Sequence, residues 1–347
     1  MMKALVKYKK GMGYIEVREV RKPAINSREV LIKVKFAGIC GTDIHIWHDQ
    51  FPYWPPVVLG HEFSGEIVKI GSSVEGWKVG DRVVGEPHTR ACGVCQLCRT
   101  GNIQICEQKR SPGWGIDGAF TSYIKMPTYL LHRVPDNVSF EEAAIVEPAA
   151  IVAHHVLERG RVEPGDFVAI FGAGPIGLLA AMMAKAAGAS KVMIVGTSID
   201  EKVRFKVAKK ISVDYIVNVQ NEDPVKKVMD FTNGIGADLV VEASGAEPAI
   251  NQAVKVVRKM GRISAIGLTG KNRISLPWDA AIFKVCNIIF NQSSSYTGWN
   301  KVISLLSSGK INLAPIITHK VTLEEWETAF EAVEKGEAVK ILFVPEE

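Results

Sequence analysis

The chain contains a compact cluster of four cysteines, namely Cys92, Cys95, Cys98 and Cys106. Four thiolates at this spacing can surround a Zn²⁺ ion tetrahedrally, with each sulfur at about 2.3 Å from the metal. An iron–sulfur cluster is the alternative for four thiolates. Because a site with four protein ligands leaves no position for a substrate, we expect a structural zinc that holds a long loop together.

A second candidate metal site is more widely spread along the chain. Cys40, His61 and Glu62 lie in the first part of the sequence, and Glu147 precedes Pro148. A thiolate, an imidazole and a carboxylate form a three-ligand set that leaves one coordination position open, as in catalytic zinc sites. Taken alone, Cys40 is more often a buried core thiol. Their combination with a separate four-cysteine cluster predicts a catalytic zinc, and therefore two zinc ions per chain.

A glycine-rich segment predicts a dinucleotide site. Phe171–Gly177 has the pattern G-x-G-x-x-G, and it follows an apolar strand and opens an alanine-rich helix, which is the context that this pattern requires. The glycines allow a tight turn and a close approach to a pyrophosphate, and the helix N-terminus offers N–H donors to the phosphates. The residues expected to bind the cofactor here are Gly172, Gly174, Pro175, Ile176 and Gly177.

The choice of cofactor should be made roughly 20 residues later, at the end of the second strand of this fold. Gly196 stands there, in place of the acid that commonly binds the ribose 2′-hydroxyl of NAD. The cofactor is therefore NAD(P), and the missing carboxylate favours NADP, although Asp200 could instead loop back to the ribose. The residues expected to meet the ribose or its phosphate are Gly196, Thr197, Ser198, Lys202 and Arg204.

The candidate metal and cofactor residues lie in two parts of the chain that differ in their predicted secondary structure. The first 150 residues are rich in short β-type runs, which indicate a strand-dominated, partly closed barrel-like domain; the runs are Val30–Phe36, Glu66–Ile70, Arg82–Val84 and Phe120–Met126. From Phe167 onward, strands alternate with helices, which predicts a doubly wound parallel sheet. The expected strands are Phe167–Phe171, Lys191–Val195, Tyr215–Asn218, Leu239–Glu242, Arg262–Ile266 and Asn287–Phe290. The expected helices are Ile176–Ala187, Asp200–Ile211, Asp223–Thr232 and Glu247–Val257.

The remaining segments set the domain boundaries. The tail has the pattern of a helix near Trp299–Ser307, another near Leu323–Glu334 and a last strand at Lys340–Val344. The segment Val146–Ala150, which contains a proline, is a plausible linker. We therefore expect a catalytic zinc domain at 1–150, to which the tail 297–347 returns, and a dinucleotide-binding domain at 151–296.

Composition narrows the function classes. The chain has 347 residues, with 47% hydrophobic and 23% charged residues and a net charge of +5, which is ordinary for a globular protein. Its basic residues are scattered rather than gathered in a stripe, so we expect no nucleic-acid partner. No secretory signal is visible, and the uncharged run Phe167–Ala184 contains glycines and a proline that suit a strand, turn and helix better than a membrane span. We expect a cytoplasmic protein with no membrane partner.

The three motifs, in this order, resemble the zinc-dependent medium-chain alcohol dehydrogenase/reductase family over essentially the whole chain. The resemblance implies a GroES-like catalytic domain and a Rossmann domain. It also implies that Cys40 and His61 bind the catalytic zinc and that Thr42 and His45 relay the proton of the alcohol. Classical alcohol dehydrogenases use a cysteine as the third ligand, whereas here Glu62 and Glu147 are available. That departure is similar to the polyol (sorbitol-type) and threonine dehydrogenase branches, in which one or both glutamates coordinate.

The resemblance leaves the substrate open. It implies hydride transfer between NAD(P) and a secondary alcohol or its ketone, with a polyol, sugar alcohol or sugar acid as the first candidate. L-Threonine is the alternative, because Glu86-x-His88 ahead of the four-cysteine cluster is also similar to threonine dehydrogenases, and a vicinal diol such as butanediol is third. A hypothesis from another class is a catalytically silent zinc- and nucleotide-binding protein. Relatives are homodimers or homotetramers, often paired through the last strand of the cofactor sheet, here Asn287–Phe290.

Overall fold

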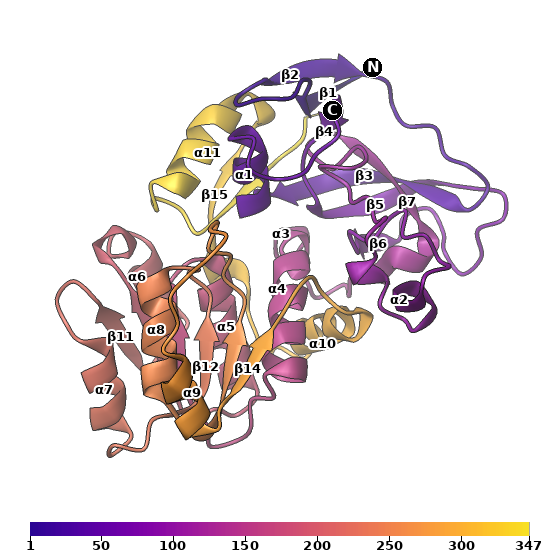
Figure 1. Ribbon diagram of the computed structural model, residues 1–347. Coiled ribbons are helices and arrows are strands. Elements are labelled where there is room, and N and C mark those ends of the chain that lie inside the picture. The colour runs from indigo at the N-terminus through magenta and orange to yellow at the C-terminus, as the bar shows by residue number, and fades with distance from the viewer. Residues whose placement is uncertain (347) are drawn as a thin grey trace.

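The computed structural model describes residues 1–346 and has two parts of different architecture (Figure 1). The upper part in the view is built mainly from strands and holds both ends of the chain, whereas the lower part is a sheet flanked by helices. This arrangement confirms the predicted α/β class, with a strand-rich domain beside a parallel-sheet domain.

The strand-rich part contains two sheets. The larger sheet has the order β15-β16-β3-β5-β6-β8, with β7 paired to the first half of β3, and the smaller has the order β2-β1-β4. Strand β3 is the longest and pairs antiparallel with both β5 and β7, so that it forms the centre of the core. The strands are β1 (Met2–Lys7), β2 (Ile15–Val20), β3 (Glu29–Gly38), β4 (Val57–Val58), β5 (Glu62–Ile70), β6 (Arg82–Gly85), β7 (Tyr123–Pro127), β8 (Leu131–Arg133), β15 (Ile317–Val321) and β16 (Lys340–Phe343).

The lower part is a six-stranded parallel sheet with the order β11-β10-β9-β12-β13-β14. This is the 3-2-1-4-5-6 order of a doubly wound dinucleotide-binding sheet. Its central strands are apolar and buried, as expected when helices cover both faces. The strands are β9 (Phe167–Phe171), β10 (Lys191–Gly196), β11 (Tyr215–Asn218), β12 (Ala237–Glu242), β13 (Val257–Ala265) and β14 (Asn287–Phe290).

Each helix expected from the sequence is present, but the one expected near Trp299 starts at Tyr296 and the one expected near Leu323 starts at Trp326, after a 3₁₀ turn. The segment expected to be helical from Asp200 begins instead with a 3₁₀ turn, η4 (Ser198–Asp200), and the helix proper starts at Arg204. Within residues 1–346 no helix is long and apolar enough to cross a membrane. The helices are α1 (Gly41–Trp47), α2 (Gln96–Arg99), α3 (Phe140–Ala144), α4 (Val146–Val152), α5 (Pro175–Ala186), α6 (Arg204–Lys210), α7 (Pro224–Phe231), α8 (Glu247–Val256), α9 (Trp278–Lys284), α10 (Tyr296–Ser307) and α11 (Trp326–Glu334).

The expected linker at 146–150 is a helix. It forms α4, which continues without a break into a π-helix, η3 (Ala153–Arg159). Pro148 is tolerated because it lies in the first turn, where its missing N–H has no intrahelical partner to lose. The connection between the two parts is therefore a buried, continuous helix, which fixes the residues at its start relative to the parallel sheet.

The tail of the chain returns to the strand-rich part. After β14 the chain forms α10, which packs on α4, and then β15, α11 and β16. Strand β16 pairs antiparallel with the end of β3, with Leu342 opposite Gly38. The last strand is thus placed next to the segment that leads into Cys40.

Candidate active site and cofactor site

Cys40 lies where β3 passes into α1. Its backbone N–H donates to Oδ2 of Asp43 at 2.9 Å, and the Asp43 N–H donates back to the Cys40 carbonyl at 3.0 Å. These bonds satisfy donors that the start of a helix leaves free. Asp43 is fully buried, and burial raises the pKa of its carboxyl to about 6. The cap thus fixes the Cys40 backbone at the start of α1.

His61 and Glu62 stand at the beginning of β5, beside Cys40. Among the described residues, the ligand atoms of Cys40, His61 and Glu62 lie within 4.8 Å of one another. Glu62 pairs across the sheet with Gly38, where a Cβ would lie 2.3 Å from its Oε2. A glycine at position 38 is therefore what allows the Glu62 carboxylate to lie next to the thiol.

Glu147 approaches this group from a different element, the first turn of α4. It is buried, and its Oε2 has no hydrogen-bond partner among residues 1–346. Burial, together with the charge of Glu62, raises the pKa of Glu147 to about 7. It lies outside the 4.8 Å group, but its charge acts on His61. The geometry thus brings three of the four predicted ligands together and places the fourth in their electrostatic neighbourhood.

The donor set fits a metal cation. Burial alone would lower the pKa of the His61 imidazole, but the Cys40 thiolate and neighbouring carboxylates raise it to about 10. Nδ1 of His61 is buried without a partner in the described chain, as is Oε2 of Glu147. Unpartnered buried polar atoms are costly, and a divalent cation would satisfy several of them at once. Sulfur, nitrogen and oxygen donors in this combination suit zinc.

The two predicted relay residues lie on α1. Oγ1 of Thr42 is 3.7 Å from Sγ of Cys40, so this hydroxyl is at the candidate metal site. His45 follows one turn later, on the same side of the helix, and is exposed. Thr42 and His45 thus lie on one face of α1, the first beside the Cys40 thiol and the second exposed to solvent.

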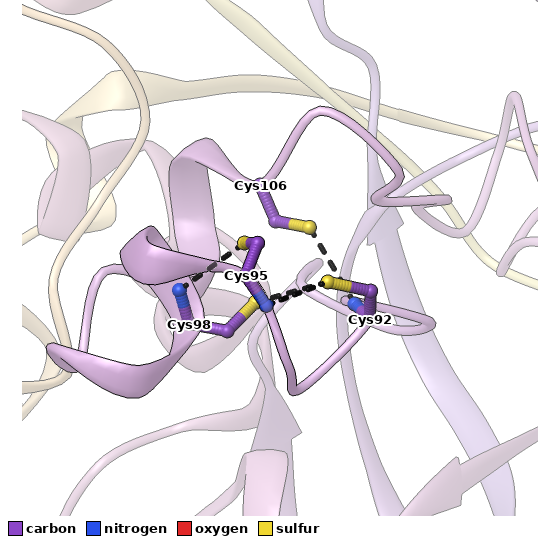
Figure 2. Close-up of side chains that lie close together, drawn as sticks. All are labelled: Cys92, Cys95, Cys98 and Cys106. Atoms are coloured by element: carbon purple, nitrogen blue, oxygen red, sulfur yellow. Dashed lines mark hydrogen bonds between the residues drawn. The ribbon is translucent and has the colours of Figure 1, made fainter.

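The four-cysteine cluster forms as predicted (Figure 2). The four sulfurs lie within 4.8 Å of one another, and backbone N–H groups point at them, with Cys95 N 3.4 Å from Sγ of Cys92 and Cys98 N 3.4 Å from Sγ of Cys95. N–H groups of Val94 and Cys95 lower the pKa of Cys92 to about 6. The backbone thus favours the thiolate form of Cys92, which is the form that binds a metal, whereas burial raises the pKa of Cys98.

The glycine-rich turn has the geometry of a dinucleotide cradle. Gly172 has φ +109°, a left-handed conformation that favours glycine. A Cβ on Gly177 would lie 1.8 Å from the Gly172 carbonyl oxygen, so only glycine fits there. Gly174 caps α5, with Pro175 and Ile176 in its first turn. The free N–H groups of this helix start therefore face the end of β9, where phosphates bind in such folds.

The residues after β10 lie at the same edge of the sheet, but their side chains are already engaged. Ser198 donates its N–H to Gln220 at 2.7 Å, and its hydroxyl accepts from Asn218 at 2.9 Å. Lys202 is exposed, with Nζ 3.9 Å from Glu337. Thr197 and Arg204 both bind Asp200.

Comparisons with known proteins agree with this geometry. Residues 26–136 match the family model of the alcohol dehydrogenase GroES-like domain, and residues 175–308 match that of the zinc-binding dehydrogenases. The chain is 40% identical over 344 residues to a sorbitol dehydrogenase of Halalkalibacterium halodurans, covering 99% of both proteins.

The chain belongs to the zinc-dependent alcohol dehydrogenase family.

Two further relatives define its branch. An L-threonine 3-dehydrogenase of Pyrococcus horikoshii is 40% identical over 350 residues, covering 99% of this chain and 98% of that protein. The structure of a zinc-binding dehydrogenase from Sinorhizobium meliloti 1021 bound to NADP superposes with a TM-score of 0.91, at 28% identity and 99% coverage of both chains. The likenesses to the sorbitol and the threonine dehydrogenase confirm the polyol and threonine dehydrogenase branch. The protein is thus a zinc-dependent oxidoreductase that transfers hydride between the CH–OH group of a secondary alcohol and NAD(P).

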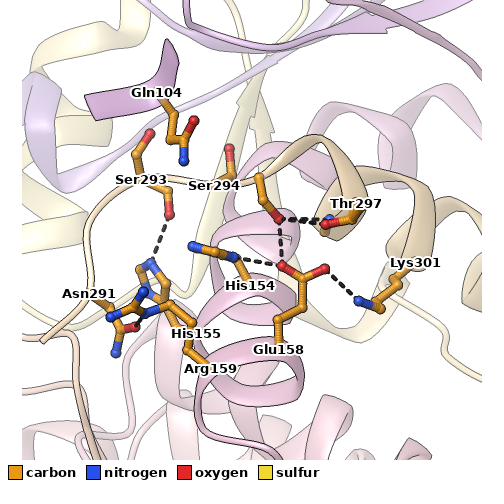
Figure 3. A network of polar contacts seen from close by, with 12 residues as sticks. Gln104, His154, His155, Glu158, Arg159, Asn291, Ser293, Ser294, Thr297 and Lys301 are labelled. Carbon is orange, nitrogen blue, oxygen red and sulfur yellow. Dashed lines mark hydrogen bonds and ion pairs between the residues drawn. The ribbon is translucent and has the colours of Figure 1, made fainter. Parts of the chain in front are cut away.

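A polar network in this dehydrogenase ties the connecting helix to the loop before α10 (Figure 3). Oε2 of Glu158 accepts from His154 at 2.7 Å and from Ser295 at 2.6 Å, and its Oε1 pairs with Lys301 at 2.5 Å. One turn away, His155 contacts the Ser293 carbonyl at 2.7 Å. These bonds attach η3, the continuation of the helix that carries Glu147 in its first turn, to the segment that follows the last strand of the cofactor sheet.

Three charged residues near the candidate metal of the dehydrogenase were not predicted from the sequence. Asp43 is one of them. It could have been predicted, because an acid three residues after a helix N-cap, here Cys40, is a common capping pattern. Lys340 is buried against Glu62, which no local pattern predicts. Lys109 donates to the Gln104 carbonyl at 2.7 Å, and its charge acts on Glu147 and His88. Lys109 therefore lies between the four-cysteine loop and the candidate catalytic group.

Proposed function

We propose that this dehydrogenase oxidises a secondary hydroxyl of a polyol, sugar alcohol or sugar acid to the ketone and catalyses the reverse reduction. The observation that carries the proposal is the juxtaposition of Cys40, His61 and Glu62, with a second carboxylate, Glu147, buried beside them. Two carboxylates at the site suit a substrate with several hydroxyl groups, which can donate hydrogen bonds to them. The likeness to a sorbitol dehydrogenase supports the same class.

Cys40, His61 and Glu62 would hold the catalytic zinc, with Glu147 as an additional or exchanging ligand. When bound there, zinc acts as a Lewis acid that favours loss of the hydroxyl proton near neutral pH. The second zinc would be structural and held by the four cysteines. Residues of the two sites come from separate loops, so each can be removed without the other.

Thr42 would accept the proton of the alcohol at Oγ1, next to the Cys40 sulfur, as it gives up its own hydroxyl proton, and the exposed His45 would pass a proton on to solvent. The turn Gly172–Gly177 would hold the pyrophosphate of the cofactor. The chain's own contribution is thus alignment of the alcohol and the cofactor and removal of one proton, while the cofactor accepts the hydride.

L-Threonine is the second candidate. His88 is buried near Ser294, at 3.4 Å, and it belongs to the Glu86-x-His88 pattern that is similar to threonine dehydrogenases. The 40% identity to a threonine dehydrogenase supports this candidate as much as the first.

A substrate panel tests the proposal. Zinc-loaded protein is assayed at 340 nm with NAD⁺ and with NADP⁺ against sorbitol, xylitol, sugar acids, L-threonine and 2,3-butanediol. Turnover with a polyol or sugar acid that exceeds that with L-threonine by about tenfold or more supports the proposal. Turnover with L-threonine alone overturns it in favour of the second candidate.

The cellular setting and assembly belong to the same proposal. We place the protein in the cytoplasm, since reduced cysteines are needed for a four-thiolate site, and we propose a homodimer or homotetramer. The edge strand β14 ends in Phe290, whose side chain is exposed, and the adjacent α9 exposes Trp278 and Phe283. Apolar sheet edges are usually covered. We also retain the division into 1–150 with 297–347, and 151–296, as the two domains.

A further inference from the structure

The carboxyl end of β10 lacks a side chain at Gly196, yet the space beside it is filled. A Cβ at this position would lie 2.7 Å from Oδ2 of Asp200, 2.7 Å from Cε1 of Phe205 and 3.0 Å from Cβ of Ala173. Ala173 belongs to the dinucleotide turn. The carboxylate of Asp200 therefore occupies the place where an acidic side chain on the strand itself would begin, next to the turn that receives the cofactor.

Asp200 is held firmly in this place. Its Oδ2 accepts from the N–H of Thr197 at 2.8 Å and from the Thr197 hydroxyl at 3.3 Å. Its Oδ1 accepts from Arg204 at 2.9 Å, and its side chain is only 7% exposed. The 3₁₀ turn Ser198–Asp200 thus returns an acid to the end of β10, four residues later in the chain.

The guanidinium of Arg204 does not occupy the space beside Gly196. The guanidinium of Arg204 is shared between Asp200 and the Val333 carbonyl, which it reaches at 3.4 Å. None of its atoms is among the three that would lie nearest to a Cβ at position 196. At the end of β10 the Asp200 carboxylate is therefore nearer to position 196 than the Arg204 guanidinium is.

The two cofactors differ only in the group that reaches this point. The ribose 2′-hydroxyl of NAD can donate a hydrogen bond to a carboxylate, whereas the 2′-phosphate of NADP would place a dianion beside it. We propose that Asp200 is the residue that selects the cofactor and that it gives this dehydrogenase a preference for NAD over NADP. The proposal rests on the proposed function, and it reverses the preference that Gly196 alone suggests.

The test is a comparison of NADH and NADPH binding, measured by nicotinamide fluorescence on the zinc-loaded enzyme without an alcohol. Wild-type protein should bind NADH at least about tenfold more tightly than NADPH, which corresponds to about 1.4 kcal/mol. Asp200→Asn keeps the size of the side chain and removes its charge, and it should reduce this ratio by about tenfold or more. A merely structural role in the turn would weaken both cofactors equally.

A matched control and a second variant complete the design. Glu201→Gln removes the same charge from the adjacent residue, whose carboxylate binds Asn218 at 2.6 Å, and should leave the ratio unchanged. Asp200→Ala removes the carboxylate altogether and should reduce the ratio of NADH to NADPH affinity at least as much as Asp200→Asn does. Melting temperatures identify any variant that fails to fold.

The outcomes separate the two proposals. A wild-type preference for NADPH, an unchanged ratio in folded Asp200→Asn, or no binding of either dinucleotide overturns the assignment of Asp200. Tight, selective NADH binding with no polyol oxidation leaves that assignment in place and contradicts only the proposed substrate.

Discussion

Lys340 donates a hydrogen bond of 2.7 Å to Oε1 of Glu62 and another of 2.8 Å to the Ile39 carbonyl. Both side chains of this ion pair are almost fully buried, at 3% and 0% exposure. Burial alone would lower the pKa of Lys340, but the charges of Glu62 and Cys40 raise it. The last strand of the chain thus supplies the counter-charge for a candidate metal ligand on β5.

Removing one partner of the Lys340–Glu62 ion pair should lower the stability of the protein. Lys340→Met leaves Glu62 buried and unpaired, for which we expect a loss of about 3–5 kcal/mol in the free energy of unfolding, measured in urea on metal-free protein. The double variant Lys340→Met/Glu62→Gln should recover most of that loss, because no buried charge is then left. A single variant as stable as wild type would contradict this account.

Cys40→Ala should remove one of two zinc ions per chain and leave the fold intact. Turnover should fall by about a thousandfold or more, because several kcal/mol of charge stabilisation at the alcohol oxygen is lost. Metal content by mass spectrometry, circular dichroism and initial rates provide the measurements. Cys286→Ala is the control, since the Cys286 thiol donates to the Ala281 carbonyl and belongs to neither cluster. Near wild-type activity in Cys40→Ala would disprove the zinc mechanism.

Cys98→Ser should remove the other zinc and act on stability rather than chemistry. Metal binding at a closed four-thiolate site contributes directly to folding. We expect a clear fall in melting temperature and faster proteolysis between residues 92 and 106, with residual turnover by the molecules that remain folded. If the melting temperature and the protease pattern were unchanged, the loop would not depend on a metal.

Glu158→Gln should change how stability depends on pH. Burial would raise the pKa of Glu158, but hydrogen bonds from Lys301, Ser295 and His154 lower it from 4.5 to about 2. A lowered folded-state pKa gives stability that is fully present above about pH 4.5 and is lost as the pH falls toward 2. The variant should therefore be less stable than wild type by about 2 kcal/mol at pH 7, and this difference should shrink at pH 3.5 in urea titrations. A constant difference at both pH values would argue against an ionised Glu158 in the network.

Phe290→Asp should weaken self-association through β14. A charge at the exposed end of this apolar edge strand opposes pairing with a second copy. Light scattering after size exclusion should report a smaller assembly than that of wild type, with an unchanged circular dichroism spectrum. Tyr129→Asp is the comparison, because Tyr129 is similarly exposed but lies in the strand-rich part of the chain. An identical mass for wild type and Phe290→Asp would exclude β14 as the contact.

Local sequence patterns predicted the elements that are formed by residues close together in the sequence. The strand at Phe167–Phe171 and the helix that follows were expected almost to the residue, because apolar runs, glycines and a helix start lie next to one another in the sequence. The four-cysteine cluster could be predicted equally well, because the spacing of the cysteines alone permits a tetrahedral metal site.

Contacts between segments that are distant in the sequence could not be predicted from local patterns. The pairing of Lys340 with Glu62 spans 278 positions and depends on β16 pairing with β3. The start of α6 was misplaced because Asp200, a good helix-starting residue, is instead folded back against Gly196. The role of Lys340 is set by neighbours in space, which sequence spacing does not encode, whereas Asp200 forms a local capping box with Thr197 that the spacing allowed and the prediction missed.

The return of the tail has a consequence for how the protein is made. A ribosome releases the residues of β3, α1 and β5 early, yet the strand that neutralises Glu62 emerges only after the entire parallel sheet. The nascent metal pocket thus carries an uncompensated acid until the final few residues arrive. A chain cut short before β16 would keep its cofactor sheet but leave the buried Glu62 carboxylate without the charge of Lys340, and its strand-rich part would be destabilised.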